Sequence, residues 1–146
     1  MSKLTLIRGI PGAGKSTLAD MLVLIGKSAG VDTVHYEADQ LFMKNGKYEF
    51  NASLLSQAHE LCQQNTFEAL GNGKSVVVAN TFVTIKELKP YFQIAKDFDL
   101  VPHVILCQSN YGSVHGVPED TLHSMRKKFA YDLSPLFELL KNETVS

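Results

Sequence analysis

Short apolar runs alternate with longer amphipathic segments along this chain. The runs consist of aliphatic and β-branched residues and stop at glycine or polar residues, which is typical of buried parallel strands. They predict strands at residues 4–7, 31–36, 75–79 and 101–108. The segments between them repeat apolar residues at helical spacing. They predict helices at residues 15–29, 53–70, 84–98 and 118–132, and a short last helix that begins at Ser134.

Local signals refine three of these segments. Thr84, with Glu87 three residues later, is the pattern of a capping box that opens a helix. Pro90 lies inside the same predicted helix, so we expect a kink there. Residues 37–51 are polar and interrupted by glycine, and they predict a loop with a short helical stretch around Leu41.

The alternation of strands and helices predicts an α/β fold. The expected architecture is a three-layer, doubly wound, mostly parallel sheet with helices on both faces. At 146 residues the chain has the size of one compact domain. We therefore expect a single domain over residues 1–146, with a small helical lid and the last helices at about residues 109–141.

Composition excludes several classes of protein. Hydrophobic residues are 45% and charged residues 20%, as in an ordinary folded chain. The net charge of −1 gives no general attraction to nucleic acid or an anionic membrane, so a polyanion would have to be bound locally. No apolar run has the length of a membrane helix or a signal peptide. Cys62 and Cys107 lack CxxC-type spacing, so we expect two core thiols in a cytoplasmic protein without membrane contact. No pattern indicates an oligomeric state.

A phosphate-binding loop is predicted at residues 9–16. The sequence Gly-Ile-Pro-Gly-Ala-Gly-Lys-Ser matches the pattern of Gly, four residues, then Gly-Lys-Ser. It lies between a predicted strand and a predicted helix, as this motif requires. The residues expected to contact a nucleotide are Gly9, Pro11, Gly12, Ala13, Gly14, Lys15, Ser16 and Thr17.

Each residue type in this loop has a chemical role. Glycines let successive backbone N–H groups point inward, and the following helix adds free N–H groups and the positive end of its dipole. The ammonium group of Lys15 is expected to contact the β- and γ-phosphates, so Lys15 is a candidate catalytic residue. Ser16 offers its hydroxyl as a ligand to Mg²⁺. The loop therefore predicts a nucleoside triphosphate and Mg²⁺ as cofactors.

Residues that could act on the group that receives the γ-phosphate should lie where the predicted strands end, because ligands of doubly wound sheets bind at the carboxyl edge. Asp39 follows the second strand and could accept the proton of an attacking hydroxyl, or it could cap a helix. Glu37 is the second choice for this general base. Asn80 ends the third strand and is neutral where many phosphate-loop proteins carry an aspartate for Mg²⁺. It could bind a water, the γ-phosphate or the substrate, or it could hold loop backbone.

Two candidates follow the fourth strand. Arg126 stands in the densest positive cluster of the chain, and as a lid residue it could stabilise the transferring charge with its guanidinium. The neighbouring Lys127 and Lys128 fit an exposed helix face. His115 is a candidate for docking the acceptor, or else a structural loop residue.

Four segments in this order resemble the polynucleotide-kinase-like P-loop ATPases, which include kinase-like domains found beside Smr nuclease domains. The similarity covers about residues 3 to 131. The segments are residues 9–16, 37–39, 76–81 and 114–126.

This resemblance implies ATP and Mg²⁺ as cofactors and a 5′-hydroxyl polynucleotide end as the acceptor. It places Lys15 and Ser16 on the donor phosphates. It makes Asp39 the base and Arg126 the lid arginine. One position departs from the family pattern: an arginine three residues after the base grips the acceptor phosphate in polynucleotide kinases, and this chain has Phe42 there. Phe42 could stack on a base or pack in the core.

The sequence thus predicts an enzyme, a P-loop kinase that moves the γ-phosphate of ATP to a hydroxyl. The first choice of acceptor is a 5′-hydroxyl nucleic-acid end or a nucleotide. Two alternatives stay open: a kinase of a small metabolite, and a regulatory module that binds or hydrolyses ATP without a phosphoryl acceptor. Nucleic-acid binding would weaken with salt, which separates the first choice from a metabolite kinase.

Overall fold

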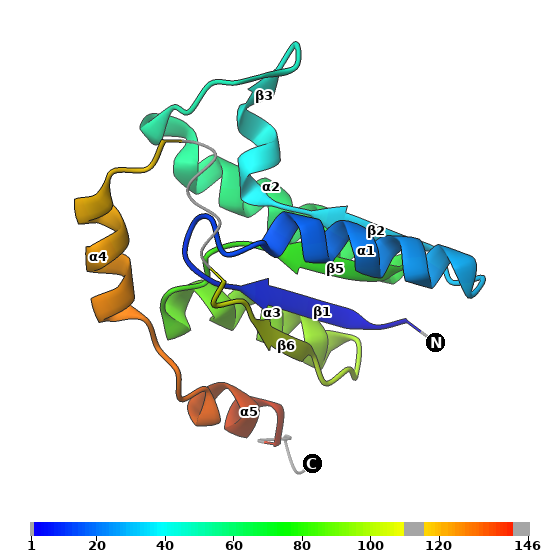
Figure 1. The fold of residues 1–146 in the computed structure, drawn as a ribbon. Helices are drawn as coiled ribbons and strands as arrows, with labels where there is room; N and C mark the ends of the chain where they lie inside the picture. Colours follow the sequence, from blue (N-terminus) through cyan, green and yellow to red (C-terminus); the bar gives the residue numbers. More distant parts are fainter. Residues whose placement is uncertain (1, 110–115, 142–146) are drawn as a thin grey trace.

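A parallel β-sheet forms the centre of the molecule (Figure 1). The computed structural model describes residues 2–109 and 116–141. The strands of its four-stranded sheet are β1 (Leu4–Arg8), β2 (Thr33–Tyr36), β5 (Ser75–Ala79) and β6 (His103–Leu106). Their order is β2-β5-β1-β6, and every neighbouring pair is parallel. The predicted α/β class and parallel sheet are confirmed.

Helices cover both faces of this sheet, which confirms the three-layer arrangement. They are α1 (Lys15–Ser28), α2 (Leu55–Gly71), α3 (Ile85–Asp97), α4 (Glu119–Lys128) and α5 (Ser134–Lys141). A large core cluster joins one face of the sheet to α2, α3 and α5, and a smaller cluster lies under α1 on the other face. β5 is buried along its whole length, which explains its uninterrupted apolar sequence. Within the described residues, no helix is both long and apolar enough to cross a membrane.

The polar segment between β2 and α2 contains more structure than the sequence indicated. A 3₁₀ helix, η1 (Ala38–Phe42), lies at the predicted helical stretch. A hairpin that was not predicted follows, and Asn45 and Gly46 form its turn. Both turn residues have positive φ, 51° and 79°, as the tight turns of two-residue hairpins require. The remaining elements are β3 (Met43–Lys44), β4 (Lys47–Tyr48) and a second 3₁₀ helix, η2 (Ala52–Leu54).

Several elements are shorter than predicted, and two of them lose four residues or more. The fourth strand is reduced to β6, and the helix expected to reach residue 132 ends as α4 at Lys128. α4 ends there because Phe129 takes an extended backbone conformation and buries its ring. The N–H of Ala130 then donates to the carbonyl of Val83 at 2.8 Å. Contacts distant in sequence therefore override the helical pattern.

The predicted capping box is present at the start of α3. Thr84 Oγ1 accepts a hydrogen bond from the N–H of Glu87 at 3.3 Å, and the Glu87 carboxylate accepts one from the N–H of Thr84 at 2.8 Å. Pro90 lies inside α3, which continues to Asp97. The kink at Pro90 stays a prediction.

Arg8, at the end of β1, joins three segments at the carboxyl edge of the sheet. Its side chain is buried, and Nε and Nη2 donate to the carbonyl of Phe82 at 3.0 and 2.6 Å. Nη1 donates to the carbonyl of Ala130 at 2.6 Å, and the guanidinium lies 4.2 Å from the centre of the Phe129 ring. Burial lowers the pKa of Arg8, and the charge of Glu87 opposes this effect. These contacts fix the end of α4 beyond the strand ends, where Figure 1 shows the helix.

Replacing Arg8 with methionine should lower the free energy of unfolding by about 2–6 kcal/mol, because two carbonyl groups lose their donor at about 1–3 kcal/mol each. Urea denaturation measures this change. Lys89→Met, at an exposed position of α3, is the matched control and should change stability by less than about 0.5 kcal/mol. An equally small change for Arg8→Met would contradict the anchoring role.

Candidate functional site

The phosphate-binding loop connects β1 to α1 and has the backbone that its glycines were predicted to allow. Gly12 and Gly14 have φ of 86° and 89°, in the left-handed region that favours glycine. Gly14 is the N-cap of α1, and no side chain caps this end of the helix. The first N–H groups of α1 have no partner within the helix and lie at the positive end of its dipole. The loop therefore presents an anion-binding surface.

Gly9 lies where the loop passes closest to the sheet. Its N–H donates to the carbonyl of Thr81 at 3.2 Å. A Cβ atom at Gly9 would lie 2.5 Å from the carbonyl oxygen of Cys107, which real Cβ atoms do not approach so closely. The loop thus begins between the ends of β5 and β6, and only glycine fits there.

Lys15 reaches back over this loop from the first turn of α1. Its Nζ donates to the carbonyl of Ile10 at 3.0 Å. Burial lowers the pKa of the Lys15 ammonium, and the negative charges of Glu37 and Asp39 oppose this shift. The charges of both carboxylates that follow β2 therefore act on Lys15.

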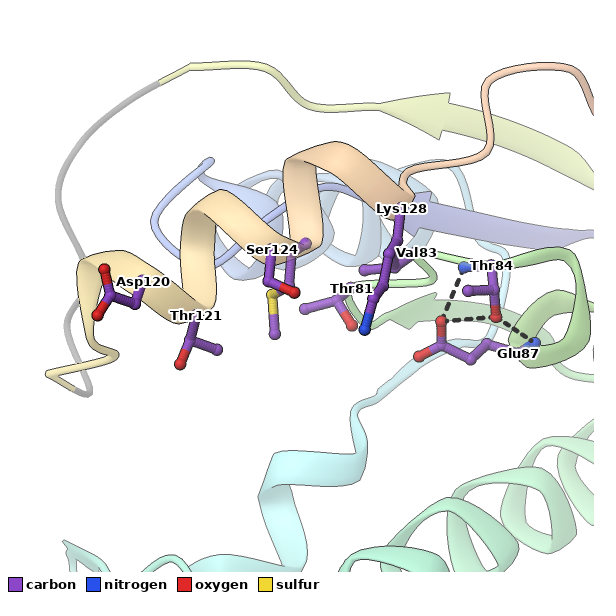
Figure 2. Close-up of a pocket in the computed structure, with 9 residues that line it drawn as sticks. Thr81, Val83, Thr84, Glu87, Asp120, Thr121, Ser124 and Lys128 are labelled. Atoms are coloured by element: carbon purple, nitrogen blue, oxygen red, sulfur yellow. Dashed lines mark hydrogen bonds between the residues drawn. The ribbon is translucent and has the colours of Figure 1, made fainter.

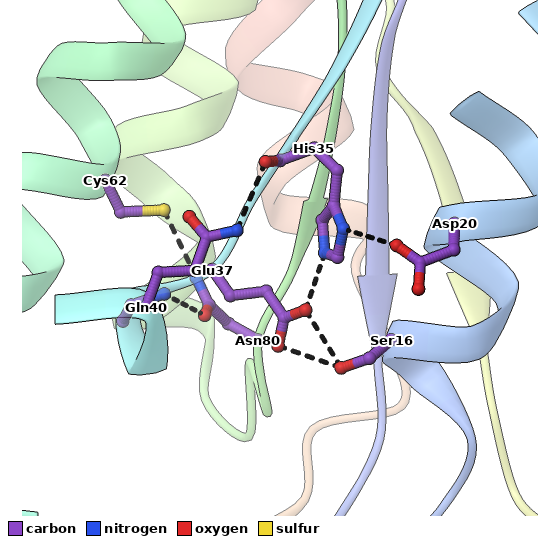
Figure 3. A network of polar contacts seen from close by, with 8 residues as sticks. Ser16, Asp20, His35, Glu37, Gln40, Cys62 and Asn80 are labelled. Atoms are coloured by element: carbon purple, nitrogen blue, oxygen red, sulfur yellow. Dashed lines mark hydrogen bonds and ion pairs between the residues drawn. The ribbon is translucent and has the colours of Figure 1, made fainter. Parts of the chain in front are cut away.

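Ser16 begins a chain of polar contacts that ends on the outer face of α1 (Figure 3). Its Oγ donates to the Glu37 carboxylate, with both oxygens at 2.9 Å. His35 Nε2 lies 2.6 Å from Glu37 Oε2. His35 Nδ1 lies 3.2 Å from Asp20 Oδ1. The sequence indicated Ser16 at this site but not the contact with Glu37.

The charge state of His35 follows from these neighbours. Burial is the largest influence and lowers the pKa of His35, but hydrogen bonds and charges from Glu37 and Asp20 together outweigh it. The net result is a pKa above the ordinary value for histidine, which favours the imidazolium beside Glu37.

A divalent cation at this site would need oxygen atoms from a bound phosphate group. Residues 2–109 and 116–141 contain no cluster of three or more His, Cys, Asp or Glu side chains that could hold a metal ion. The Ser16 hydroxyl fits the hard oxygen ligands that Mg²⁺ prefers. It lies in the first turn of α1, where a bound phosphate would also lie, so the donor set suits a metal that bridges protein and nucleotide.

Asp39 lies inside η1 and does not cap it, which sets aside the capping alternative. The N-cap of η1 is Glu37, whose side chain makes no capping hydrogen bond. The Tyr48 hydroxyl donates to Asp39 Oδ1 at 3.4 Å, and burial and the Asp39 charge raise the pKa of Tyr48. Tyr48 thus stays protonated as a donor to a half-buried carboxylate at the carboxyl edge.

The side chain of Asn80 holds loop backbone. This was one of the two possibilities predicted for Asn80, and the other was binding a water, the γ-phosphate or the substrate. Its Oδ1 accepts from the N–H of Ala38 at 2.9 Å, and its Nδ2 lies 3.8 Å from Cys62 Sγ. Its side chain is buried. Asn80 therefore fixes the start of η1, and with it Asp39. Phe42 is also buried, so it packs in the core and offers no surface to a base.

A cavity of about 470 Å³ separates α4 from the junction of β5 and α3 (Figure 2). Four hydroxyl groups line it, together with charged and apolar side chains. The lining residues are Thr81, Val83, Thr84, Glu87, Asp120, Thr121, Ser124, Met125 and Lys128. Because Thr81 follows Asn80 directly, this cavity lies next to the segment that carries Asp39.

Lys128 and Arg126 of α4 differ in their relation to this cavity. Lys128 is exposed, as its helix face predicted, and it also lies on the wall of the cavity. Arg126 does not line it, and its Nη1 donates to Glu119 Oε1 on the same helix at 3.2 Å. Residues 121, 125 and 128 share one helical face, and this spacing was the signal that could have identified Lys128. His115 lies outside the described residues.

A second cavity, of about 500 Å³, lies beside the start of α1, and Ala13, Gly14 and Thr17 of the predicted nucleotide-binding segment line part of it. Apolar side chains form most of its wall. It is lined by Ala13, Gly14, Thr17, Leu18, Met21, Cys107 and Ser109.

Comparison with known proteins identifies the family. A family model described as an AAA domain, AAA_33, matches residues 4–130. The chain belongs to this AAA-domain family. Human NEDD4-binding protein 2 is 36% identical to this chain over 94 residues, which make up 64% of this chain and 5% of that protein. The chain thus spans only a small part of this relative.

Two solved structures share the fold of this AAA domain. A chain of the Pnkp1/Rnl/Hen1 RNA repair complex has a TM-score of 0.65 at 15% identity, over 94% of this chain and 46% of that chain. A variant of the Mycobacterium tuberculosis APS kinase CysC has a TM-score of 0.59 at 12% identity, over 88% of this chain and 98% of that chain. The fold is therefore kinase-like, as the resemblance implied.

Gly9→Ala should lower the free energy of unfolding by about 1–3 kcal/mol or more, because the added methyl group forces the backbone of the loop or of β6 to move. Thermal and urea denaturation measure this loss. Gly71→Ala is the matched control, since its Cβ would meet only the Phe98 ring at 3.8 Å. If both variants were as stable as the wild type, the close approach at Gly9 would be refuted.

Proposed function

We propose that this chain is an ATP-dependent phosphotransferase that moves the γ-phosphate of ATP to a hydroxyl group. The observation that carries the proposal is the position of Asp39. The charge of this side chain opposes the burial that lowers the pKa of Lys15, and the residue lies at the edge of the sheet that also borders the cavity under α4. Donor loop, carboxylate and cavity are then arranged in the order that transfer to a hydroxyl needs.

The donor side is assigned to the loop and α1. Backbone N–H groups of Gly12, Ala13 and Gly14 and the first turn of α1 would hold the phosphates. Lys15 would leave the Ile10 carbonyl for the β- and γ-phosphates. Ser16 would hold Mg²⁺, which neutralises charge on the phosphates as they react. The apolar cavity beside α1 has room for the nucleoside.

The acceptor side is assigned to Asp39 and the cavity under α4. Asp39 would accept the proton of the attacking hydroxyl, while Tyr48 orients its carboxylate. Lys128 supplies a cation on the cavity wall for a negatively charged acceptor. Arg126 stays the predicted lid arginine, and it would have to exchange Glu119 for the nucleotide.

Our first choice of acceptor is a 5′-hydroxyl nucleic-acid end or a nucleotide. The likeness to a chain of an RNA repair complex supports this choice, and the cavity has a volume in the range of small-molecule sites. The likeness to an APS kinase supports a small metabolite instead. Buried Phe42 leaves no guanidinium for an acceptor phosphate at that place, so Lys128 takes over that role in our proposal. Two thiols without a disulfide, Cys62 and Cys107, favour a cytoplasmic setting.

Asp39→Asn should reduce phosphoryl transfer by about 100-fold or more and leave the affinity for a non-hydrolysable ATP analogue within about threefold, because the base acts only on the acceptor. Lys15→Ala should lose transfer and weaken nucleotide binding while the fold is kept. Transfer from γ-labelled ATP and calorimetry measure both effects. Asp99→Asn, an exposed carboxylate after α3, is the control. Normal turnover of Asp39→Asn would remove Asp39 as the base.

The acceptor follows from incubation with γ-labelled ATP and a panel of 5′-hydroxyl DNA, 5′-hydroxyl RNA, nucleosides and sugars. We expect label on a nucleic-acid end or a nucleotide. Label on a sugar or another metabolite would favour the second choice. Slow ATP hydrolysis without any labelled product would favour a regulatory module.

A further inference from the structure

The site contains no carboxylate at the place where a phosphate-loop protein commonly holds its metal. That place is the end of β5, next to the strand that leads into the loop. Here the strand ends with Ala79 and Asn80. The Asn80 carboxamide is neutral and buried, and it contacts the N–H of Ala38 and the thiol of Cys62 rather than Ser16.

Glu37 brings a carboxylate to Ser16 from the neighbouring strand. β2 pairs with β5 in a register that sets Tyr36 opposite Val78, so the next residue, Glu37, lies beside Ala79 at the edge of the sheet. Both of its oxygens lie 2.9 Å from Ser16 Oγ. Glu37 is the N-cap residue of η1, yet its side chain is turned away from that helix and toward the loop.

We infer that Glu37 supplies the carboxylate of the Mg²⁺-nucleotide site and replaces the acidic residue that is absent from the end of β5. The inference rests on the proposed function in one respect, since it requires that a nucleotide binds at the loop. Glu37 then takes part in binding the cation, and Asp39 remains the residue that accepts the proton of the attacking hydroxyl.

The hydrogen bond of Ser16 is the first physical reason. A serine hydroxyl has one proton to donate and two lone pairs. Because Ser16 donates its proton to Glu37, its lone pairs are directed elsewhere and are free to bind a cation. The carboxylate thus fixes the orientation in which Ser16 can serve as a metal ligand.

Electrostatic repulsion is the second reason. The charge of Glu37 is the strongest of those that raise the pKa of Lys15, so the carboxylate lies within the field of the loop. A carboxylate 2.9 Å from Ser16 Oγ, in the first turn of α1, would repel the phosphates of a nucleotide. A divalent cation between them turns that repulsion into attraction. Glu37 therefore makes nucleotide binding dependent on the cation.

His35 and Asp20 are positioning residues for this carboxylate. His35 Nε2 lies 2.6 Å from Glu37 Oε2, and both side chains are mostly buried, at 13% and 17% exposed. Asp20 contacts His35 Nδ1 at 3.2 Å and is itself 75% exposed. These contacts hold the Glu37 carboxylate beside Ser16, and ligating groups commonly need such outer partners.

The test compares the affinity for a non-hydrolysable ATP analogue with Mg²⁺ and with EDTA, by calorimetry. For the wild type we expect Mg²⁺ to tighten binding by about tenfold or more. Glu37→Gln should bind the analogue in EDTA as well as the wild type or better, because repulsion is removed. The factor by which Mg²⁺ raises the affinity of this variant for the analogue should fall to about twofold or less. Glu37→Asp should recover part of the increase in affinity that Mg²⁺ causes. Glu49 is an exposed glutamate, so Glu49→Gln should retain the whole increase.

A double-mutant cycle with Ser16→Ala connects the two residues. If they act on the same cation, Ser16→Ala with Glu37→Gln should lose no more of the Mg²⁺ gain than either change alone. Asp20→Asn should lose a smaller part of the gain, as a positioning role predicts. Circular dichroism confirms that each variant is folded.

The outcomes separate this inference from the proposed function. A full Mg²⁺ gain in Glu37→Gln, or a wild type that binds the analogue equally well with and without Mg²⁺, would overturn the role of Glu37 and leave nucleotide binding intact. A wild type that binds no analogue under either condition would overturn the proposed function itself.

Discussion

The close approach of the backbone at Gly9 to the end of β6 is the constraint on which the rest of the site depends. With the Cys107 carbonyl where a Cβ atom would lie, the chain can leave β1 only through a residue without a side chain. That exit directs residues 10–14 into a loop whose end is the N-terminus of α1. The unpaired N–H groups of the helix consequently face the same edge of the sheet at which the strands end.

Side chains at the strand ends then hold the parts of this edge together. Arg8 connects β1 to the turn after β5 and to the end of α4. Asn80 connects β5 to the start of η1, and Glu37 connects β2 to α1 through Ser16. Phosphoryl transfer depends mainly on positioning and electrostatics. These cross-strand contacts keep the phosphate-binding loop and the segment that carries Asp39 from shifting independently, which suits the transfer that we propose.

The elements with long, regular patterns could be predicted from the sequence, and so could the loop, because its signal is local. β1 and β5 are continuous apolar runs, and the capping box at Thr84 needs only two residues. The hairpin at Asn45 was missed because its strands are two residues long and show no periodicity, although Asn-Gly is a turn signal.

The contacts of Glu37 with Ser16 and of Arg126 with Glu119 could not be predicted in the same way. Periodicity does not reveal which strands are neighbours, and the contact of Glu37 with Ser16 follows from the order β2-β5-β1-β6. Whether Lys128 or Arg126 faces the cavity depends on the rotation of α4, which the buried Phe129 sets from outside the helix.

In the proposed function, the backbone amides at the start of α1 bind the phosphates of a nucleotide. Titration of the ¹⁵N-labelled protein with Mg²⁺ and a non-hydrolysable ATP analogue, followed by amide chemical shifts, tests this binding at each residue. We expect the largest shifts at Gly12, Gly14, Lys15 and Ser16. Saturable binding that leaves these four amides unchanged, or no binding at millimolar analogue, would contradict it.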